Sequence, residues 1–146
     1  MLQGQIPRSE YELQNLTGLG LSSNKFSGVV ELDKLLNLKH LSNLDLSYNG
    51  LSLNINNNVN STLHYFETIG LASYNLSEFP NFSRVLLDLI ALDLSNNKIH
   101  GEVPKWIFDV GKNTLDSLDL SHNFLTSLEY LPWKNLEYIN LHSNLL

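Results

Sequence analysis

The sequence predicts an α/β repeat solenoid of about six coils, with one short strand from each coil joined in a curved parallel sheet. A nine-residue pattern, with apolar residues at its fourth and sixth positions, returns six times along the 146 residues. The apolar residue at the sixth position is Leu21, Leu46, Leu71, Leu94, Leu120 and Leu141. The steps between these leucines are 25, 25, 23, 26 and 21 residues. Side chains two positions apart lie on one face of a strand, so each coil needs a neighbour to bury that face.

Composition narrows the class of protein. The formal net charge is −6, the sequence pI is about 5.2 and the chain contains no cysteine. An acidic chain lacks the excess of Lys and Arg with which proteins neutralise nucleic-acid phosphates or bind anionic membranes. The length suits one domain, and a hydrophobic content of 42% is typical of a globular chain. No apolar run is long enough to span a bilayer, and the N-terminal residues do not read as a signal peptide.

Each strand should be followed by an asparagine, whose amide donates to and accepts from backbone groups where the chain leaves the strand. An apolar residue two positions later should close the same core. These residues are Phe26, Leu51, Leu76, Ile99, Leu125 and Leu146. In one copy Tyr74 replaces the asparagine, and a phenol cannot donate twice. We expect a local distortion there, or Asn75 in part of the same role.

The second half of a coil carries glycine and proline signals. Residues 99–104 and 2–7 share the form L-x-G-x-I/V-P, and residues 26–30 keep only the glycine. Glycine permits a turn that other residues resist, and proline suits the start of a helical turn. The amphipathic stretch 105–110 should therefore form a short 3₁₀ or helical turn on the convex side.

Together these motifs resemble the plant extracellular type of leucine-rich repeat, whose consensus joins LxxLxLxxN to LxGxIP. Residues 71–80 and 30–49 are similar to the ectodomains of plant receptor-like proteins of the pathogen-resistance type. The resemblance implies a leucine-rich repeat segment of a receptor at the plasma membrane, facing the cell exterior and acting in defence signalling. It also implies an extracellular peptide or protein ligand and a co-receptor kinase as partners.

Members of that family also have a signal peptide, cysteine-flanked caps and one transmembrane helix. Residues 1–146 are expected instead to form a single uncapped array that is cut within a repeat at both ends. We interpret the sequence as an internal fragment of a longer receptor, or as a truncated product, that does not itself insert into the membrane.

The residues beside the strand leucines predict a binding face on the concave side of the sheet. Six outward positions carry carboxylates and none carries Lys or Arg; these are Asp45, Glu67, Asp93, Asp116, Asp119 and Glu137. The expected contact residues are Asn43, Asp45, Tyr48, Asp93, Asn96, Asp116, Asp119, His122, Tyr138 and His142. Complementary charge favours a polar or cationic peptide or protein surface. The alternative is that Asp belongs to the repeat consensus and this face is only solvated.

Four Asn-x-Ser/Thr sequons begin at Asn15, Asn60, Asn75 and Asn81. An asparagine-rich chain of this length would contain about three by chance, so the sequons become glycosylation sites only together with the extracellular resemblance. Asn15 and Asn75 flank predicted strands and should be exposed.

No motif predicts an enzyme, a cofactor or a metal centre. Asp119, Ser121 and His122 are triad residue types, but their alternating directions on one strand oppose the nested hydrogen bonds of a catalytic triad. His122 and His142 should approach each other without the carboxylate shell of a metal site. Beside the receptor segment, two interpretations remain open: an intracellular repeat scaffold, and a structural spacer with no activity of its own.

Overall fold

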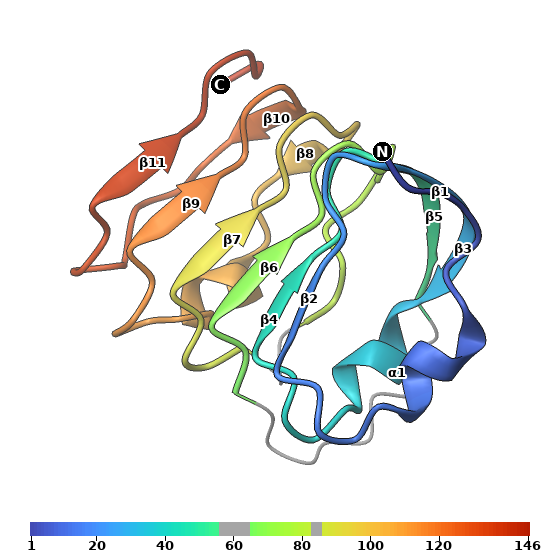
Figure 1. The fold of residues 1–146 in the computed structure, drawn as a ribbon. Helices are drawn as coiled ribbons and strands as arrows, with labels where there is room; N and C mark the ends of the chain where they lie inside the picture. Colours follow the sequence, from blue (N-terminus) through green and yellow to red (C-terminus); the bar gives the residue numbers. More distant parts are fainter. Residues whose placement is uncertain (56–64, 83–85) are drawn as a thin grey trace.

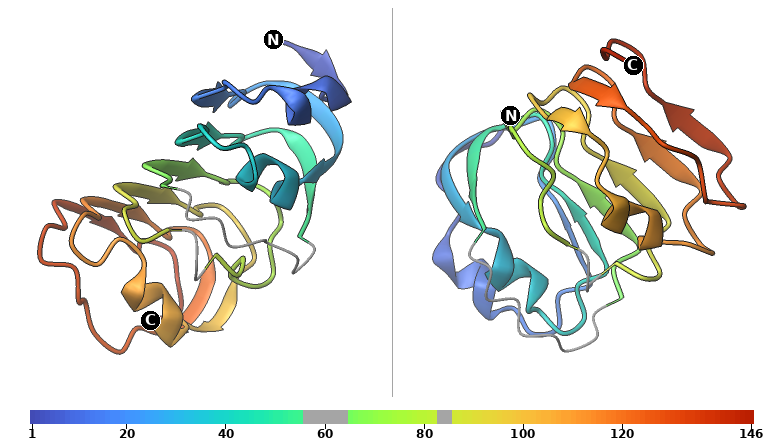
Figure 2. Two further views of the ribbon diagram at one scale, coloured as in Figure 1. Left: turned by 90° about the horizontal axis from the view of Figure 1, so that it is seen from below. Right: turned by 180° about the vertical axis from the view of Figure 1, so that it is seen from behind.

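The computed structural model describes residues 1–55, 65–82 and 86–146 and shows a stack of coils joined by a six-stranded parallel sheet. Neighbouring strands follow chain order, and the sheet consists of β2 (Gly18–Gly20), β4 (Asn43–Asp45), β6 (Thr68–Gly70), β7 (Ala91–Asp93), β9 (Ser117–Asp119) and β11 (Tyr138–Asn140) (Figure 1). The coils spread wider on the side away from this sheet, so the sheet lies on the inner side of the curve (Figure 2). The predicted solenoid is confirmed, and we call this side of the sheet the inner face.

The register of the sheet places equivalent residues of the repeat side by side. Leu44 lies opposite Leu19 and Ile69, and Leu118 lies opposite Leu92 and Ile139. Two positions further on, the backbone N–H groups of successive strand leucines each donate to a carbonyl of the next coil; the donors are Leu21, Leu46, Leu71, Leu94 and Leu120. The expected alignment of these leucines is therefore confirmed.

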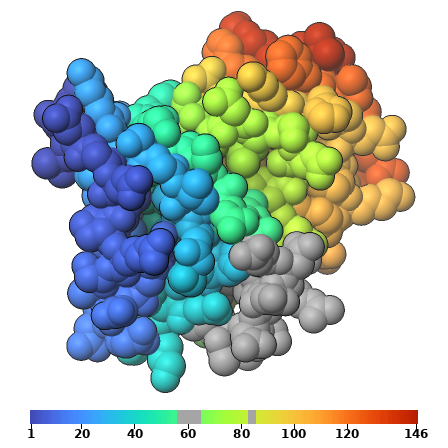
Figure 3. All heavy atoms as spheres, turned by 90° about the vertical axis from the view of Figure 1, so that its right-hand side faces the viewer, coloured from blue at the N-terminus to red at the C-terminus, as the bar shows by residue number. Residues whose placement is uncertain are grey.

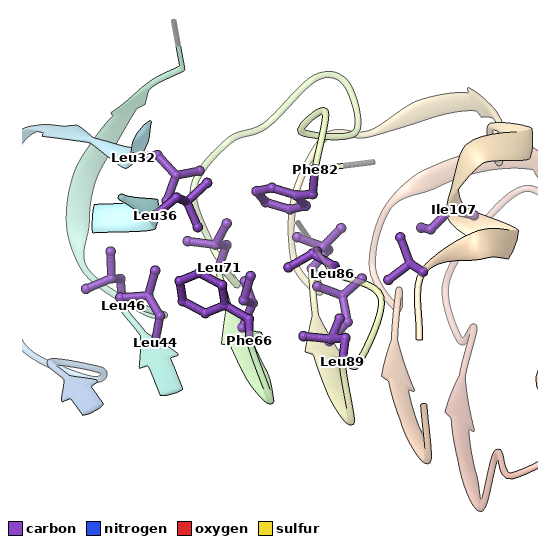
Figure 4. Close-up of a cluster of buried hydrophobic side chains, with 14 of the residues drawn as sticks. Leu32, Leu36, Leu44, Leu46, Phe66, Leu71, Phe82, Leu86, Leu89 and Ile107 are labelled. Atoms are coloured by element: carbon purple, nitrogen blue, oxygen red, sulfur yellow. The ribbon is translucent and has the colours of Figure 1, made fainter. Parts of the chain in front are cut away.

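The core is a continuous column of apolar side chains between the sheet and the outer turns. Figure 4 shows Leu44 of β4, with Leu46 and Leu71 just past the ends of β4 and β6, lying near Leu32 and Leu36 from the outer side. All five side chains are at most 2% exposed. Burial of a leucine side chain stabilises a fold by about 1.5–3 kcal/mol, so this column is the main source of stability. In the space-filling view the coils follow one another in chain order along its length (Figure 3).

One expected core residue is not in the core. Phe26, Leu51, Ile99 and Leu125 are buried as predicted and Leu76 is partly buried against the core, whereas Leu146 is 54% exposed. A residue at this place is covered by the neighbouring coil, and no later coil of the described chain packs on Leu146. The prediction for Leu146 was wrong for that reason.

A second layer of strands follows the asparagines and was not predicted. The strands β1 (Gln3–Gly4), β3 (Lys25–Glu31) and β5 (Gly50–Asn54) form one parallel sheet, and β8 (His100–Glu102) pairs with β10 (Phe124–Ser127). In β3 the buried Phe26 and Val30 share one face with the half-buried Gly28, while the residues between them are exposed, which is a strand pattern. In the coil between these two sheets, the described residues 71–82 contain no strand.

Short helical turns complete the convex side, as predicted for residues 105–110. They are η1 (Arg8–Glu12), α1 (Leu32–Leu36) and η2 (Lys105–Asp109). The turn η2 begins directly after Pro104 and buries Ile107 and Phe108. The glycines of the repeated motif have the positive φ that the sequence predicts: 97° at Gly4, 100° at Gly28 and 86° at Gly101.

The asparagine after each strand joins two coils through its amide. Asn123 Nδ2 lies 3.1 Å from the Leu120 carbonyl of its own coil and 3.0 Å from the Leu94 carbonyl of the preceding coil. Its Oδ1 accepts from the Ile99 N–H at 3.0 Å. Asn97 and Asn49 make the same set of bonds. The predicted role of these asparagines is confirmed.

Tyr74 keeps the bond between coils that an asparagine would make. Its phenol donates to the Leu46 carbonyl at 3.2 Å, and the side chain is buried. The sheet register at β6 is unbroken, but Asn75 takes a positive φ of 55°, which the residue at this place takes in no other described coil. The expected distortion is therefore confined to the turn, and no described hydrogen bond gives Asn75 the role of the missing asparagine.

Candidate ligand-binding face

A shallow depression of about 310 Å³ lies on the inner face, across four of its strands and beside a fifth. Its floor consists of short side chains that point outward between the buried strand residues: Thr68, Gly70, Ala91 and Ser117. Asp45, Asp93 and Asp119 border it, and Tyr138, which is 51% exposed, forms a wall at one end. The depression exists because small residues on β6, β7 and β9 stand between larger ones on β4 and β11.

Gly70 determines where the Asp45 carboxylate lies. A methyl group built on Gly70 would stand 2.5 Å from Asp45 Oδ1 and 2.9 Å from Ser47 Oγ. The Asp45 side chain therefore leans from β4 over the bare backbone of β6 toward Asp93 on β7. The residue between the two apolar residues of each inner strand is Asp in three of the six coils. The close approach of Asp45 is a physical reason for a glycine at this position in β6.

Each border carboxylate uses one oxygen in a bond to its own backbone, and Asp119 also uses its second oxygen, because Asn140 Nδ2 donates to Asp119 Oδ2 at 3.1 Å. Oδ1 accepts the backbone N–H two residues later, at 3.0 Å for Asp45, 2.8 Å for Asp93 and 2.9 Å for Asp119. Asn140 makes the same bond to the His142 N–H at 3.2 Å. The bond therefore needs an oxygen and not a charge. Apart from the second oxygen of Asp119, the repeat consensus accounts for one oxygen of each carboxylate, and no described ion pair neutralises the three negative charges.

No cationic side chain of the described residues lines the depression. The ion pairs found among these residues lie elsewhere: Lys34 Nζ is 2.7 Å from Glu31 Oε2, and Lys105 Nζ is 3.9 Å from Glu129 Oε2. Three carboxylates above a concave, partly apolar floor attract cations, because opposite charges interact more strongly where water is partly excluded.

The other expected contact residues do not gather at this depression. Asn43 lies further along the sheet, where its Oδ1 accepts from Thr68 Oγ1 at 2.8 Å and its Nδ2 lies 3.4 Å from Glu67 Oε2. Asp116 is half-buried just before β9, and its carbonyl accepts from the N–H of Glu137. Neither residue lines the depression.

Tyr48, Asn96 and His122 lie past the ends of the strands, in a left-handed turn that sequence reasoning missed. Their φ angles are 55°, 53° and 54°, and the equivalent residues of the other coils, Ser23, Ser73 and Ser143, have φ angles of 56–66°. A left-handed residue interrupts the alternation of side chains along a strand, so these three side chains leave the plane of the inner face. The sequence signal for the left-handed turn was Asn96, because Asn adopts the left-handed conformation more readily than most residues.

Asn96 and His122 line a second cavity, of about 380 Å³, at this margin of the sheet. His122 also meets His142, with ring centroids 5.4 Å apart, as expected. Ser121 Oγ donates to Asp119 Oδ1 at 2.6 Å, while the His122 ring lies against His142, so these residues do not form a relay. Among residues 1–55, 65–82 and 86–146, no group of three His, Cys, Asp or Glu side chains could hold a metal ion.

Asn15, Asn75 and Asn81 are exposed, as glycosylation requires, and Asn60 lies outside the described residues. In the described part of the chain, no helix has the length and hydropathy of a membrane span.

Sequence and structure comparisons agree on one class of protein. The family model of the Leucine Rich Repeat matches residues 88–110. The chain is 33% identical to Receptor like protein 28 of Arabidopsis thaliana over 97% of its own length, and 40% identical to Receptor like protein 22 of the same plant over 78%. It spans only 18% and 14% of these two relatives.

Solved structures of plant receptors share the fold. The ectodomain of the Arabidopsis thaliana receptor kinase GASSHO1/SCHENGEN3, in complex with CASPARIAN STRIP INTEGRITY FACTOR 2, matches 97% of the chain and 17% of its own with a TM-score of 0.83 and 33% identity. The Arabidopsis receptor kinase HAESA, in complex with the peptide hormone IDA and the co-receptor SERK1, matches 97% of the chain and 24% of its own with a TM-score of 0.78 and 28% identity. A plant ice-binding protein matches 98% of the chain and 46% of its own with a TM-score of 0.78 and 33% identity, so the fold alone does not determine the ligand.

Proposed function

This chain belongs to the leucine-rich repeat proteins, as a segment similar to plant receptor-like proteins, and we propose that its inner face binds a basic segment of an extracellular peptide or protein. The bound segment lies across the depression bordered by Asp45, Asp93 and Asp119. No chemical step is involved, and the face acts by recognition alone.

One observation carries this proposal: three carboxylates border one depression, and no cation of the described chain lines it. Burying or crowding uncompensated like charges costs free energy, which a cationic ligand would recover. The structural use that the three residues share, the bond to the backbone two residues later, is met equally by the amide of Asn140, and among the described hydrogen bonds only Asp119 accepts further ones, from Ser121 Oγ and Asn140 Nδ2.

The spacing of the sheet suits an extended ligand. Strands of a sheet lie about 4.8 Å apart, so the backbones at Asp45 and Asp93, which are separated by β6, stand about 10 Å apart along the array. Alternate side chains of an extended peptide are about 7 Å apart, within reach of such a pair through long Lys or Arg side chains. Tyr138 at the end of the depression offers an aromatic surface for an apolar or guanidinium group.

The similarity to receptor-like proteins supports a proposal for the cellular setting. We place the chain on the extracellular side of the plasma membrane as part of a receptor-like protein in defence signalling, with a co-receptor kinase as a further partner. HAESA, with its peptide hormone and co-receptor, is an example of such an assembly.

The test compares three amidated and acetylated peptides of equal length, which carry two Arg, two Gln or two Glu residues in a Gly-Ser background. The chain is made in bacteria, and the dissociation constants are measured by NMR titration at low salt. The Arg peptide should bind most tightly, and its affinity should fall as salt is added, because screening weakens exposed charge pairs.

Matched variants locate the binding. In Asp45→Asn/Asp93→Asn/Asp119→Asn the amides keep the backbone bond and remove three charges, as Asn140 does naturally. The two Arg residues form two exposed ion pairs at about 0.5 kcal/mol each, so their loss amounts to about a fivefold loss of affinity for the Arg peptide. The control Glu12→Gln/Glu102→Gln/Asp109→Asn changes the net charge equally at exposed sites outside the six-stranded sheet. Bacterial expression is essential, because each Asn on the inner face creates an Asn-Leu-Ser sequon.

Equal affinity for the Arg and Glu peptides would refute the proposal. An equal loss of affinity in the control variant would refute it too, since general charge attraction would then explain the binding. Either result would favour a spacer or scaffold segment.

A further inference from the structure

The cavity of about 380 Å³ at the margin of the sheet has no part in the proposed peptide site. We call it the margin pocket; it is lined by Ser73, Asn75, Asn96, Asn97, Lys98, His122, Asn123, Phe124 and Ser143. It lies just past the ends of β6, β7, β9 and β11, where four consecutive coils bring equivalent turns together.

We propose that the margin pocket holds the first sugars of an N-linked glycan attached to Asn75. The inference rests on the proposed function in one respect, because N-glycosylation requires that the chain enter the secretory route. The glycan would then fold back on the protein instead of projecting into water.

Asn75 is both a sequon asparagine and a lining residue of the pocket. Its side chain is exposed, and Ser77, the hydroxyl residue of the sequon, is exposed as well. The backbone of Asn75 has a φ of 55°, whereas Lys98 and Phe124, at the same place in the next two coils, are not left-handed. The turn that Tyr74 creates therefore gives Asn75 a backbone direction unlike that of its two neighbours in the pocket.

The chemistry of the lining suits a sugar. Its described residues present amides and hydroxyls, one ammonium and one imidazole, and no carboxylate. Phe124 is 50% exposed, so its ring offers an apolar surface. A sugar can contact both kinds of surface. Its hydroxyl and N-acetyl groups form hydrogen bonds, and the C–H groups of one ring face pack on an aromatic ring.

Some polar groups of the margin pocket are already used in bonds between coils, and others are open to a ligand. The amides of Asn97 and Asn123 are used in bonds between coils and form a fixed floor. Asn96 Nδ2 donates to Ser73 Oγ at 3.1 Å, which orients its carbonyl oxygen as an acceptor. No described ion pair involves Lys98, so its ammonium is available to hydroxyl groups.

The attachment itself follows the ordinary chemistry of N-glycosylation. Asn75 Nδ2 loses one proton and forms a bond to C1 of N-acetylglucosamine, while the lipid-linked oligosaccharide donor leaves as its lipid pyrophosphate. The consequence for the rest of the molecule is that Asn96 and His122 contact the glycan, leaving the inner face to the peptide.

The test uses the chain secreted from plant cells. Glycopeptide mass spectrometry should find Asn75 occupied. An endoglycosidase should release the Asn75 glycan at least about fivefold more slowly from the native protein than from the denatured protein, because a packed glycan is shielded. In Phe124→Ser the two rates should approach each other, since the apolar wall is gone.

Thermal unfolding supplies a second readout. Ser77→Ala removes the glycan and should lower the Tm by about 2–4 °C. In the Phe124→Ser background the same change should leave the Tm unaltered. The matched control is Thr17→Ala, which removes the sequon of Asn15, an exposed residue that does not line the margin pocket.

An unoccupied Asn75 on the secreted chain, or equal release rates from native and denatured protein, would overturn the inference. The peptide titrations use bacterial protein without glycans, so they succeed or fail independently of this outcome.

Discussion

At the scale of single residues, the asparagine after each strand is the most connected side chain of the repeat. Asn123 is buried, its amide donates to carbonyls of two coils, and its oxygen accepts from the preceding coil. Buried polar groups that lose their partner cost about 1–3 kcal/mol each. Loss of one such asparagine should therefore cost about as much as loss of one buried leucine.

Asn123→Ala should destabilise the chain by about 2 kcal/mol, because the buried N–H of Ile99 loses its partner and the carbonyls of Leu94 and Leu120 each lose one of two amide donors. Chemical unfolding followed by circular dichroism measures this. Asn15→Ala, at an exposed site, should change stability by less than about 0.5 kcal/mol. Equal effects of both substitutions would contradict the role given to the asparagine bonds.

Tyr74 predicts a dependence of stability on alkaline pH. Burial raises the pKa of Tyr74 above its usual value near 10, and the negative Asp45 carboxylate adds to the shift. The stabilisation from the neutral phenol is complete below about pH 10. Above that, the unfolded chain loses the proton first, so stability should fall by up to about 1.4 kcal/mol per pH unit.

Urea unfolding between about pH 9 and pH 11, on either side of the usual tyrosine pKa, tests this with Tyr74→Phe as the comparison. The variant loses the bond to the Leu46 carbonyl, which Asn49 also serves, so it should lose only about 0.5–1.5 kcal/mol at neutral pH. Its stability should fall less steeply at alkaline pH. Parallel curves for both proteins would show that Tyr74 does not cause the slope.

At the scale of elements, tight turns control how each coil returns to the inner sheet. Gly111 follows η2 with a φ of 50°, and a methyl group at this position would collide with the Leu89 carbonyl and with Leu115. Both obstacles belong to the packed interior, because Leu89 and Leu115 are buried. The turn after η2 has no room for a side chain.

Gly111→Ala should therefore cost at least about 2 kcal/mol, from backbone strain and steric conflict together. Gly20→Ala is the matched control, because a methyl group on Gly20 would meet no atom within 4 Å and the φ of this residue is not positive. The control should be neutral or slightly stabilising. Differential scanning calorimetry compares the two, and a similar Tm for both variants would argue against the collision.

Elements whose residue pattern recurs in every coil, or that carry a distinct local motif, could be predicted from the sequence. Elements whose pattern differs from coil to coil could not. The inner strands follow from the leucine pairs, and η2 from Pro104 and its apolar pattern. The second layer of strands was missed because its alternation is clear in residues 26–30 but absent from residues 75–79, where Tyr74 changes the turn.

The candidate site was predicted only in part, for a related reason. Asp45, Asp93, Asp119 and Tyr138 come together as outward residues of the sheet. Asn96 and His122 were expected beside them, but their left-handed backbone places them in the margin pocket. The left-handed conformation of the one residue after each inner strand could not be predicted from the alternation of side-chain directions, because that argument assumes that the strand continues.

At the scale of the whole molecule, stability accumulates between neighbouring coils. The central apolar residues of the inner strands β4, β6, β7 and β9 are buried, namely Leu44, Ile69, Leu92 and Leu118, whereas Leu19, Leu21, Ile139 and Leu141 in and beside the outer strands β2 and β11 are only partly buried. Strands of the inner sheet pair only with those of adjacent coils, so the array need not open as one unit.

Hydrogen exchange should therefore be graded along the chain. The N–H groups of Leu46, Leu71 and Leu94, which bond to the next coil from a buried leucine, should exchange most slowly. The amide of Leu21 beside the first strand should exchange at least about tenfold faster. Uniform protection from end to end would show that the coils open together.

The inner face is proposed, above all, to recognise a cationic ligand through its column of carboxylates. Chemical-shift mapping of the labelled chain with the Arg peptide tests this most directly. We expect the shifts to concentrate on the amides of Thr68, Gly70, Ala91 and Ser117, which floor the depression, and to spare residues 105–109 on the convex side. Shifts centred on the convex side, or none at millimolar peptide, would contradict it.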